Sequence, residues 1–333
     1  MVPTGVSIMF KNIQAFCLVF IISLHLAGPA FAQSNYPSKP IRLVVGYPPG
    51  GTAYQLARVL AVGVGKSLGQ NYIVENRPGA NGNLAADLVA KSPADGYTLL
   101  MTAPGPVAVN VHVYPALTFD PKTAFSPIAR VAVAPLVLVV NKQLPVQNLK
   151  ELLAYAKANP SKASYASQGN ASSGHLAMEL FKTRAGLQAE HVPYKGSTPA
   201  LNDLLAGHVL MMFDNTTSSL PQVRAGNLKA IAVAEDKRIA VAPDIPTVAE
   251  SGYEGFSATP WFGLVTTAGT PAFVIQKWVA GIHDVLKSPA IKERFAQSGV
   301  ELVIDTPELF STYIESESRK WKEVVRISGA RAD

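Results

Sequence analysis

The sequence of 333 residues is nearly devoid of cysteine, and its single cysteine, Cys17, lies in an N-terminal segment that we expect to be removed. Without that segment the chain has no thiol, so we expect no disulfide, no thiol chemistry and no thiolate metal ligand. Disulfide-rich secreted domains are therefore excluded.

Charged residues are also few, at 16% of the chain, whereas 48% of the residues are hydrophobic. Such a chain can bury a large core, and its length predicts one large domain or two lobes. The formal net charge is +6, but the basic residues form no run and no stripe with aromatic side chains. We therefore expect no nucleic-acid partner, and only a mild attraction for small anions.

The first 32 residues have the pattern of a secretory signal peptide. Lys11 stands before the apolar run "IQAFCLVFIISLHLAG", and "AFA", which ends at Ala32, is a small-residue cleavage site. The run is short for a membrane-spanning helix, and His25 and Pro29 close it. We expect cleavage after about Ala32 and a soluble protein in the periplasm.

Short apolar runs alternate with longer runs of helical periodicity, which predicts an α/β protein with mostly parallel sheets flanked by helices. The expected strands are 41–47, 72–76, 97–103, 135–140, 163–167, 191–195, 209–215, 228–234 and 261–267. The expected helices are 53–68, 83–91, 148–158, 174–185, 198–206, 218–225, 271–287, 289–298 and 307–326.

The number of expected strands favours two lobes, because a single sheet most often has about four to six strands. Segments 127–135 and 252–260 interrupt the alternation of strands and helices, and we expect the chain to cross between lobes there. The first lobe would then be discontinuous, with residues 33–130 and 256–333, and the second would contain residues 131–255. A ligand would bind in the cleft between the lobes, at the carboxyl ends of the strands.

Three turns between a strand and a helix are rich in Gly, Ser and Thr: "PPGGTA", "SQGNASSGH" and "YKGSTPA". We expect Thr52, Ser172 or Ser173, and Ser197 to cap the helices that follow. Free backbone N–H groups and the helix dipole at such a turn favour an anion. Together the three turns predict an anion-binding cleft.

Nucleotide and catalytic sites are less well supported. No Lys follows the glycines as a P-loop requires, and the Rossmann spacing is absent. Ser173, His175 and Asp214 suggest a hydrolase triad, but no G-x-S-x-G elbow surrounds the serine. We prefer a capping serine and a structural or ligand-bonding histidine. The histidines form no H-x-x-x-H pair, so no metal and no cofactor are expected.

Asp214 and Asn215 end a strand-like run, "MMFDN". They can form a solvated turn, or Asn215 and the backbone after Asp214 can donate hydrogen bonds into the cleft. Tyr47, Tyr54 and Trp261 are candidates for the walls of the cleft, and each can equally belong to the core of a lobe.

Several segments in order resemble the Bug-type solute receptors of the tripartite tricarboxylate transporter family. They are "YPSKPIRLVVGYPPGGTAYQLAR", "VENRPGANGNLAADLVAKSPADGYTLL", "YASQGNASSGHLAMELF", "HVPYKGSTPALNDLLAGHV", "MMFDN", "DIPTVAESGYEGF" and "WFGLVTTAGTP". The resemblance covers Tyr36 to about Pro271. It implies a two-lobed, type II periplasmic-binding-protein fold, also called a Venus flytrap, which closes on a small carboxylate.

The resemblance also implies where the ligand is held, because receptors of this family bind a carboxylate through backbone groups and waters near the Pro-Gly-Gly loop. With the aromatic candidates added, the expected ligand-binding residues are Tyr47, Pro49, Gly50, Gly51, Thr52, Ala53, Tyr54, Ala103, Pro104, Gly105, Ser167, Gln168, Asn170, Ser172, Ser173, His175, Gly196, Ser197, Thr198, Pro199, Asp214, Asn215 and Trp261.

Tyr54 and Leu210 depart from the family, which typically has acidic residues at these positions. An ammonium group would lack its carboxylate partner at Tyr54, so we expect a di- or tricarboxylate or an aromatic carboxylate rather than an amino acid.

The resemblance implies a monomeric receptor without catalytic activity that delivers its ligand to the membrane subunits of a tripartite tricarboxylate transporter. One alternative is a sensor that presents its ligand to a two-component kinase. A periplasmic serine hydrolase that uses Ser173 and His175 is a further alternative.

Overall fold

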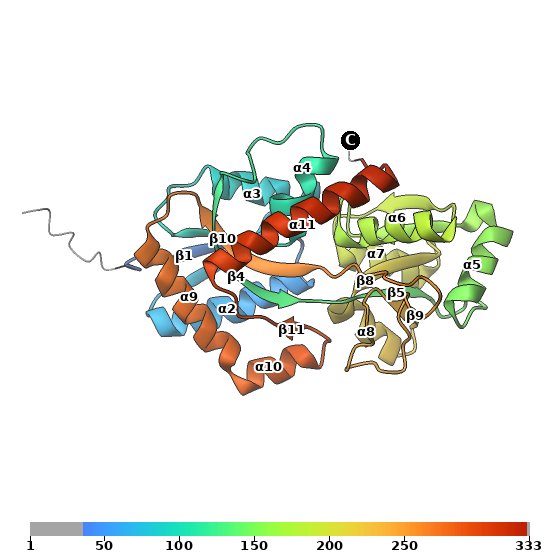
Figure 1. Ribbon diagram of the computed structural model, residues 1–333. Helices are drawn as coiled ribbons and strands as arrows, with labels where there is room; N and C mark the ends of the chain where they lie inside the picture. The colour runs from blue at the N-terminus through green and yellow to red at the C-terminus, as the bar shows by residue number, and fades with distance from the viewer. Residues whose placement is uncertain (1–35, 332–333) are drawn as a thin grey trace, which may run out of the picture. The chain divides into compact units, whose positions relative to one another are not determined.

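The computed structural model describes residues 36–331, in which two β-sheets are flanked by helices (Figure 1). The expected signal peptide, residues 1–32, lies outside the described residues, so its cleavage stays a prediction. Among the described helices, none combines the length and the apolar character that crossing a membrane requires.

The first sheet has the strand order β11-β4-β10-β3-β1-β2. Its strands are β1 (Ile41–Val45), β2 (Tyr72–Asn76), β3 (Thr98–Thr102), β4 (Phe125–Val133), β10 (Trp261–Thr267) and β11 (Glu301–Leu302). Strand β1 pairs in parallel with β2 and β3, whereas β10 is antiparallel to both β3 and β4.

The second sheet has the order β7-β6-β8-β5-β9. Its strands are β5 (Leu136–Asn141), β6 (Ser164–Ser167), β7 (Glu190–Pro193), β8 (Met211–Asn215) and β9 (Leu228–Val233). Strand β6 is parallel to β7 and β8, and β5 is antiparallel to β8 and β9.

The α/β class is confirmed, but both sheets are mixed rather than mostly parallel. The chain leaves the first sheet through β4 and returns to it through β10, and these two strands are neighbours. It enters the second sheet through β5 and leaves through β9, which are also neighbours. A strand that leads out of a sheet and a neighbouring strand that leads back into it run in opposite directions. The pairs β4–β10 and β5–β9 are therefore antiparallel.

The helices agree with the expected ranges to within two residues at each end. They are α2 (Thr52–Leu68), α3 (Asn83–Ala90), α5 (Leu149–Ala158), α6 (Ser173–Ala185), α7 (Ser197–Ala206), α8 (Thr216–Arg224), α9 (Ala272–Lys287), α10 (Pro289–Ala296) and α11 (Pro307–Ser328). The short helical segments η1 (Ala80–Gly82), η2 (Gly105–Val109), α4 (Asn110–Val113) and η3 (Pro160–Lys162) were not expected.

Strand β4 corrects one sequence expectation, because it occupies most of the segment that was expected to be a crossing. Pro127 and Arg130 interrupt the apolar pattern of this segment. The structure accommodates Pro127 opposite Val265, next to a register shift in the pairing of β4 with β10. A proline cannot donate to a sheet ladder and is tolerated where the pairing is irregular.

Helix α11 packs against the cores of both sheets, as its path in Figure 1 shows. Phe310, near its start, belongs to the core of the first sheet, and Trp321 belongs to the core of the second. Between them, Oε2 of Glu317 accepts hydrogen bonds from Nε1 of Trp321 at 3.0 Å and of Trp261 at 3.1 Å. One helix therefore links the two sheets.

Candidate functional site

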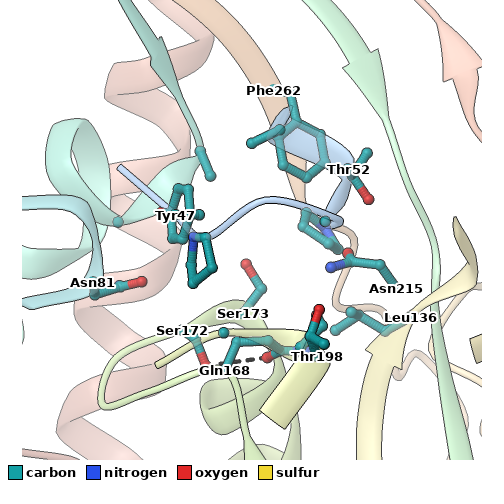
Figure 2. Close-up of a pocket in the computed structure, with 18 of the residues that line it drawn as sticks. Tyr47, Thr52, Asn81, Leu136, Gln168, Ser172, Ser173, Thr198, Asn215 and Phe262 are labelled. Atoms are coloured by element: carbon teal, nitrogen blue, oxygen red, sulfur yellow. Dashed lines mark hydrogen bonds between the residues drawn. The ribbon is translucent and has the colours of Figure 1, made fainter. Parts of the chain in front are cut away.

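A cavity lies between loops that follow strands of the first sheet and loops that follow strands of the second. Figure 2 shows Tyr47, Thr52 and Phe262 on one side and Gln168, Ser173 and Thr198 on the other. The residues that line it are Tyr47, Pro48, Pro49, Gly51, Thr52, Ala53, Asn81, Ala103, Gly105, Leu136, Gln168, Ser172, Ser173, Gly196, Ser197, Thr198, Asn215, Pro260 and Phe262.

The first turns of helices from both sheets face this cavity. Gly51, Ser172, Gly196 and Asn215 are the N-cap residues of α2, α6, α7 and α8, and all of them line it. The first N–H groups of a helix have no acceptor within the helix, and the helix dipole is positive there. Four helix N-termini therefore create a favourable environment for negative charge.

No charged side chain lines the cavity among the described residues, and no histidine does. An anion there would be bound by backbone N–H groups, by hydroxyl groups such as those of Ser173 and Thr198, and by the amide of Asn215. Binding through neutral donors avoids the free-energy cost of removing a charged protein side chain from water.

The expected cap at Ser172 is confirmed, because its Oγ accepts a hydrogen bond from the N–H of His175 at 3.3 Å. The expected caps at Thr52 and Ser197 are wrong. The N-caps of their helices are Gly51 and Gly196, and both hydroxyl residues stand one position further along. Their side chains make tertiary contacts instead.

Asp214 lies beneath the cavity, is fully buried, and is not part of its lining. Its carboxylate accepts hydrogen bonds from Nε2 of Gln168 at 2.8 Å, from Oγ of Ser197 at 2.7 Å and from Oγ of Ser218 at 2.5 Å. Burial raises the pKa of Asp214, and these hydrogen bonds oppose the rise. Asp214 is thus no solvated turn residue but a link among three segments that border the cavity.

His175 also lies behind the cavity wall, with 4% of its surface exposed. Its Nδ1 accepts the N–H of Ala171 at 3.0 Å, and its ring stacks on His191 with a centroid distance of 4.0 Å. Burial lowers the pKa of His175 to about 4 and that of His191 to about 3, so both rings are neutral near pH 7. Because Nδ1 of His175 is hydrogen-bonded to a backbone N–H, the structure gives no support to a catalytic triad with Ser173.

Of the residues expected at the site, the structure brings together Tyr47, Pro49, Gly51, Thr52, Ala53, Ala103, Gly105, Gln168, Ser172, Ser173, Gly196, Ser197, Thr198 and Asn215. It leaves out of the lining Gly50, Tyr54, Pro104, Ser167, Asn170, His175, Pro199, Asp214 and Trp261. Sequence reasoning did not identify Pro48, Asn81, Leu136, Pro260 and Phe262.

Trp261 belongs to the core of the first sheet, where it packs edge-on against Phe310 at 5.4 Å and is fully buried. Successive side chains of a strand point to opposite faces of the sheet. Phe262, the next residue of β10, consequently lines the cavity. Alternation along this strand was the signal that would have selected Phe262 instead.

Tyr54 is only partly buried and does not line the cavity, although Thr52 and Ala53 do. Each residue of a helix is rotated by about 100° from the one before, so one further position turns the side chain away. Leu210 is 7% exposed and lies in the core of the second sheet. Neither position contributes to the cavity, so the geometry does not support Tyr54 as its specificity determinant.

Two sheets whose helices direct their N-termini at one shared, uncharged cavity are the architecture of a solute-binding receptor. The chain belongs to the tripartite tricarboxylate transporter family receptors, because the model of that family matches residues 56–329.

Protein BugT of Bordetella pertussis is 40% identical over 314 residues, which cover 94% of this chain and 96% of BugT. The solved structure of R. palustris Rpa4515 with adipate has a TM-score of 0.86 and 36% identity, and covers 89% of this chain and 99% of that one. MatC from Rhodopseudomonas palustris with bound malate has a TM-score of 0.82 and 30% identity, covering 87% of this chain and 100% of that one.

Proposed function

We propose that the protein is an extracytoplasmic receptor that captures a small organic carboxylate between two lobes, residues 33–130 with 256–333 and residues 131–255. The observation that carries the proposal is the convergence of four helix N-termini on a cavity without charged side chains. Such a site compensates negative charge with backbone dipoles. Differential contacts with both lobes would favour the closed state.

The proposed ligand is a di- or tricarboxylate or an aromatic carboxylate. Adipate and malate, which the two similar solved structures contain, are both dicarboxylates. The lining of this cavity has no Asp or Glu among the described residues, so the ammonium group of an amino acid would have no carboxylate partner there. A buried ammonium without a partner is costly, which argues against an amino acid.

We propose that the closed receptor is recognised in the periplasm by membrane subunits of a tripartite tricarboxylate transporter, and that it catalyses no reaction. The family supports the transport role. The engagement of His175 with the backbone N–H of Ala171 supports the absence of a catalytic triad. The signal-peptide pattern of residues 1–32 supports export.

A thermal-shift and calorimetric screen tests this function. The panel contains adipate, malate, citrate and terephthalate, with aspartate and glutamate as matched amino-acid controls. At a ligand concentration of 100 times Kd, the folded state should gain about 2.7 kcal/mol. Stabilisation by at least one carboxylate without an ammonium group is expected. Stabilisation by the amino acids alone, or by no compound in the panel, contradicts the proposal.

A further inference from the structure

Two hydrogen bonds join the two halves of the molecule directly across the cavity. Oγ1 of Thr52, at the start of α2, lies 2.6 Å from Oγ1 of Thr217, at the start of α8. Nδ2 of Asn81, in η1, donates to the carbonyl oxygen of Ala171 at 2.8 Å. Helix α2 and η1 follow strands of the first sheet, whereas α8 and Ala171 follow strands of the second.

The threonine pair is well shielded, since Thr52 is 2% exposed and Thr217 is 7% exposed. Thr52 lines the cavity and Thr217 does not. Each hydroxyl would regain water if the two halves separated, so the hydrogen bond contributes only its net value, about 1 kcal/mol. The hydrogen bond exists only while the two halves are in contact, so it stabilises the closed form relative to the open form by this amount.

Asn81 is held in position from behind by a second asparagine. Its Nδ2 also donates to Oδ1 of Asn110 at 2.9 Å, and Nδ2 of Asn110 donates to the carbonyl oxygen of Asn81 at 3.2 Å and to Oδ1 of Asn83 at 2.6 Å. Asn110 is fully buried. All three asparagines follow strands of the first sheet, so the donor is oriented independently of the other half.

The acceptor is held in position as well. Ala171 has a left-handed backbone, with φ of 62°, and its N–H is bonded to Nδ1 of His175. The loop before α6 therefore presents the carbonyl oxygen of Ala171 to Asn81 in a fixed orientation. A hydrogen bond between two pre-oriented groups loses little conformational entropy when it forms.

We propose that Asn81 and Thr217 are positioning residues that latch the two lobes together and maintain a closed population in the absence of solute. This inference rests on the proposed closure of the lobes. The latches act on the balance between open and closed forms, so they set the affinity for solute and its dissociation rate. Thr217 does this without touching the solute, because it lies outside the lining of the cavity.

Thr217→Val removes one partner of the threonine pair, and Asn81→Gly removes the donor to Ala171 together with its hydrogen bond to Asn110. Valine reproduces the shape of threonine without its hydroxyl. Glycine suits position 81 because Asn81 has φ of 49°, a left-handed conformation that alanine would adopt only under strain. Thr216→Val is the matched control, since Thr216 is fully buried and its Oγ1 has no hydrogen-bond partner in the described part of the chain.

The experiment measures distances between spin labels in the solute-free protein. Labels are attached at Val62→Cys on α2, which is 71% exposed, and at Lys157→Cys on α5, with Cys17 replaced by Ser. We expect Thr217→Val and Asn81→Gly each to lower the ratio of the shorter to the longer distance population by about fivefold. Thr216→Val should match the wild type. Identical distributions in all four proteins would overturn the latch.

A second readout uses the acid that binds in the screen, with adipate as the first probe. Thr217→Val should raise Kd by about fivefold through a faster dissociation rate, and Thr216→Val should leave it unchanged. An unchanged Kd and dissociation rate in Thr217→Val would contradict the latch while leaving carboxylate binding intact. The label measurement needs no solute, so failure of the proposed function and failure of the latch are distinguishable.

Discussion

Oγ of Ser197 donates a 2.7 Å hydrogen bond to Oδ1 of the fully buried Asp214. The bond joins the first residue of α7 to the end of β8, directly beneath the cavity. With the bonds from Gln168 and Ser218, one carboxylate fixes the loop before α6 and the first turns of α7 and α8. The relative positions of these helix N-termini therefore depend on a side chain that lies outside the cavity.

Asp214→Ala should lower the free energy of unfolding by roughly 3 kcal/mol, because three donors lose a buried acceptor at once. Urea denaturation measures the change. Asp244→Asn is the control, since Asp244 is exposed, and its effect should stay within about 0.5 kcal/mol. Equal effects of the two substitutions would refute the role of Asp214.

Substitution of Gly51 should weaken binding in proportion to the size of the new side chain. Gly51 lines the cavity, its φ is −78°, and an added Cβ would meet no atom within 4 Å. Both alanine and valine therefore fit the backbone, and neither should lower the free energy of unfolding by more than about 1 kcal/mol. Calorimetry with the bound acid should give a higher Kd for Gly51→Ala and a still higher one for Gly51→Val. A valine variant with wild-type affinity would count against this location of the ligand.

The paired histidines should make the protein sensitive to acid. Burial lowers the pKa of His175 to about 4 and of His191 to about 3, against 6.5 for a free side chain. Between pH 6.5 and the lowered pKa values, the unfolded chain binds more protons than the folded chain. The stability that the two neutral histidines contribute above pH 6.5 is therefore lost as the pH falls. His191→Phe keeps an aromatic ring in the stack and removes one titration. Its loss of unfolding free energy between pH 7 and pH 4.5 should be smaller than that of the wild type.

Glu235 should produce the opposite pH dependence. Burial raises its pKa to about 7, the charges of Asp236 and Glu301 add to the rise, and the Thr259 hydroxyl and Lys320 oppose it. The folded state therefore binds more protons between the ordinary pKa and the raised one. The stability that Glu235 contributes at low pH is lost as the pH rises through about 7.

Glu235→Gln removes this titration and should stabilise the protein at pH 8 by about 2 kcal/mol relative to the wild type, with little difference at pH 5. Glutamine can still accept the hydrogen bond from Oγ1 of Thr259, which is 2.6 Å from Oε1 of Glu235. Chemical denaturation at the two pH values tests the prediction. A difference between the two proteins that is the same at both values would contradict it.

The helices and most strands could be predicted because their signals are local. Gly186 and Gly207, for example, end α6 and α7 in left-handed conformations that glycine favours. Strand β4 could not be found in this way, because Arg130 interrupts its apolar pattern. The structure compensates that charge with Asp305, 2.8 Å away, and with the ring of Tyr313. Both partners lie far along the chain, where no local pattern reveals them.

The candidate site, too, could be predicted only where its signals are local. The Gly/Ser/Thr-rich turns were recognisable, and most of their residues line the cavity. Leu136 and Phe262 reach it only through the packing of the two sheets. Asn81 had a readable signal, since it stands between two glycines in "GANG", and all three residues after Pro78 and Gly79 take up positive φ. What that signal could not show is the partner, Ala171, on the other side of the cavity.

The central claim is that neutral donors at helix N-termini bind a carboxylate because it is negatively charged. Calorimetric titration of the protein with adipate and malate, each compared with its uncharged diamide, tests this claim most directly. The account predicts that at least one acid binds and that its diamide binds at least about 100-fold more weakly, since the amide lacks the charge that the helix dipoles favour. Equal affinities for an acid and its diamide, or no binding of either acid, would contradict it.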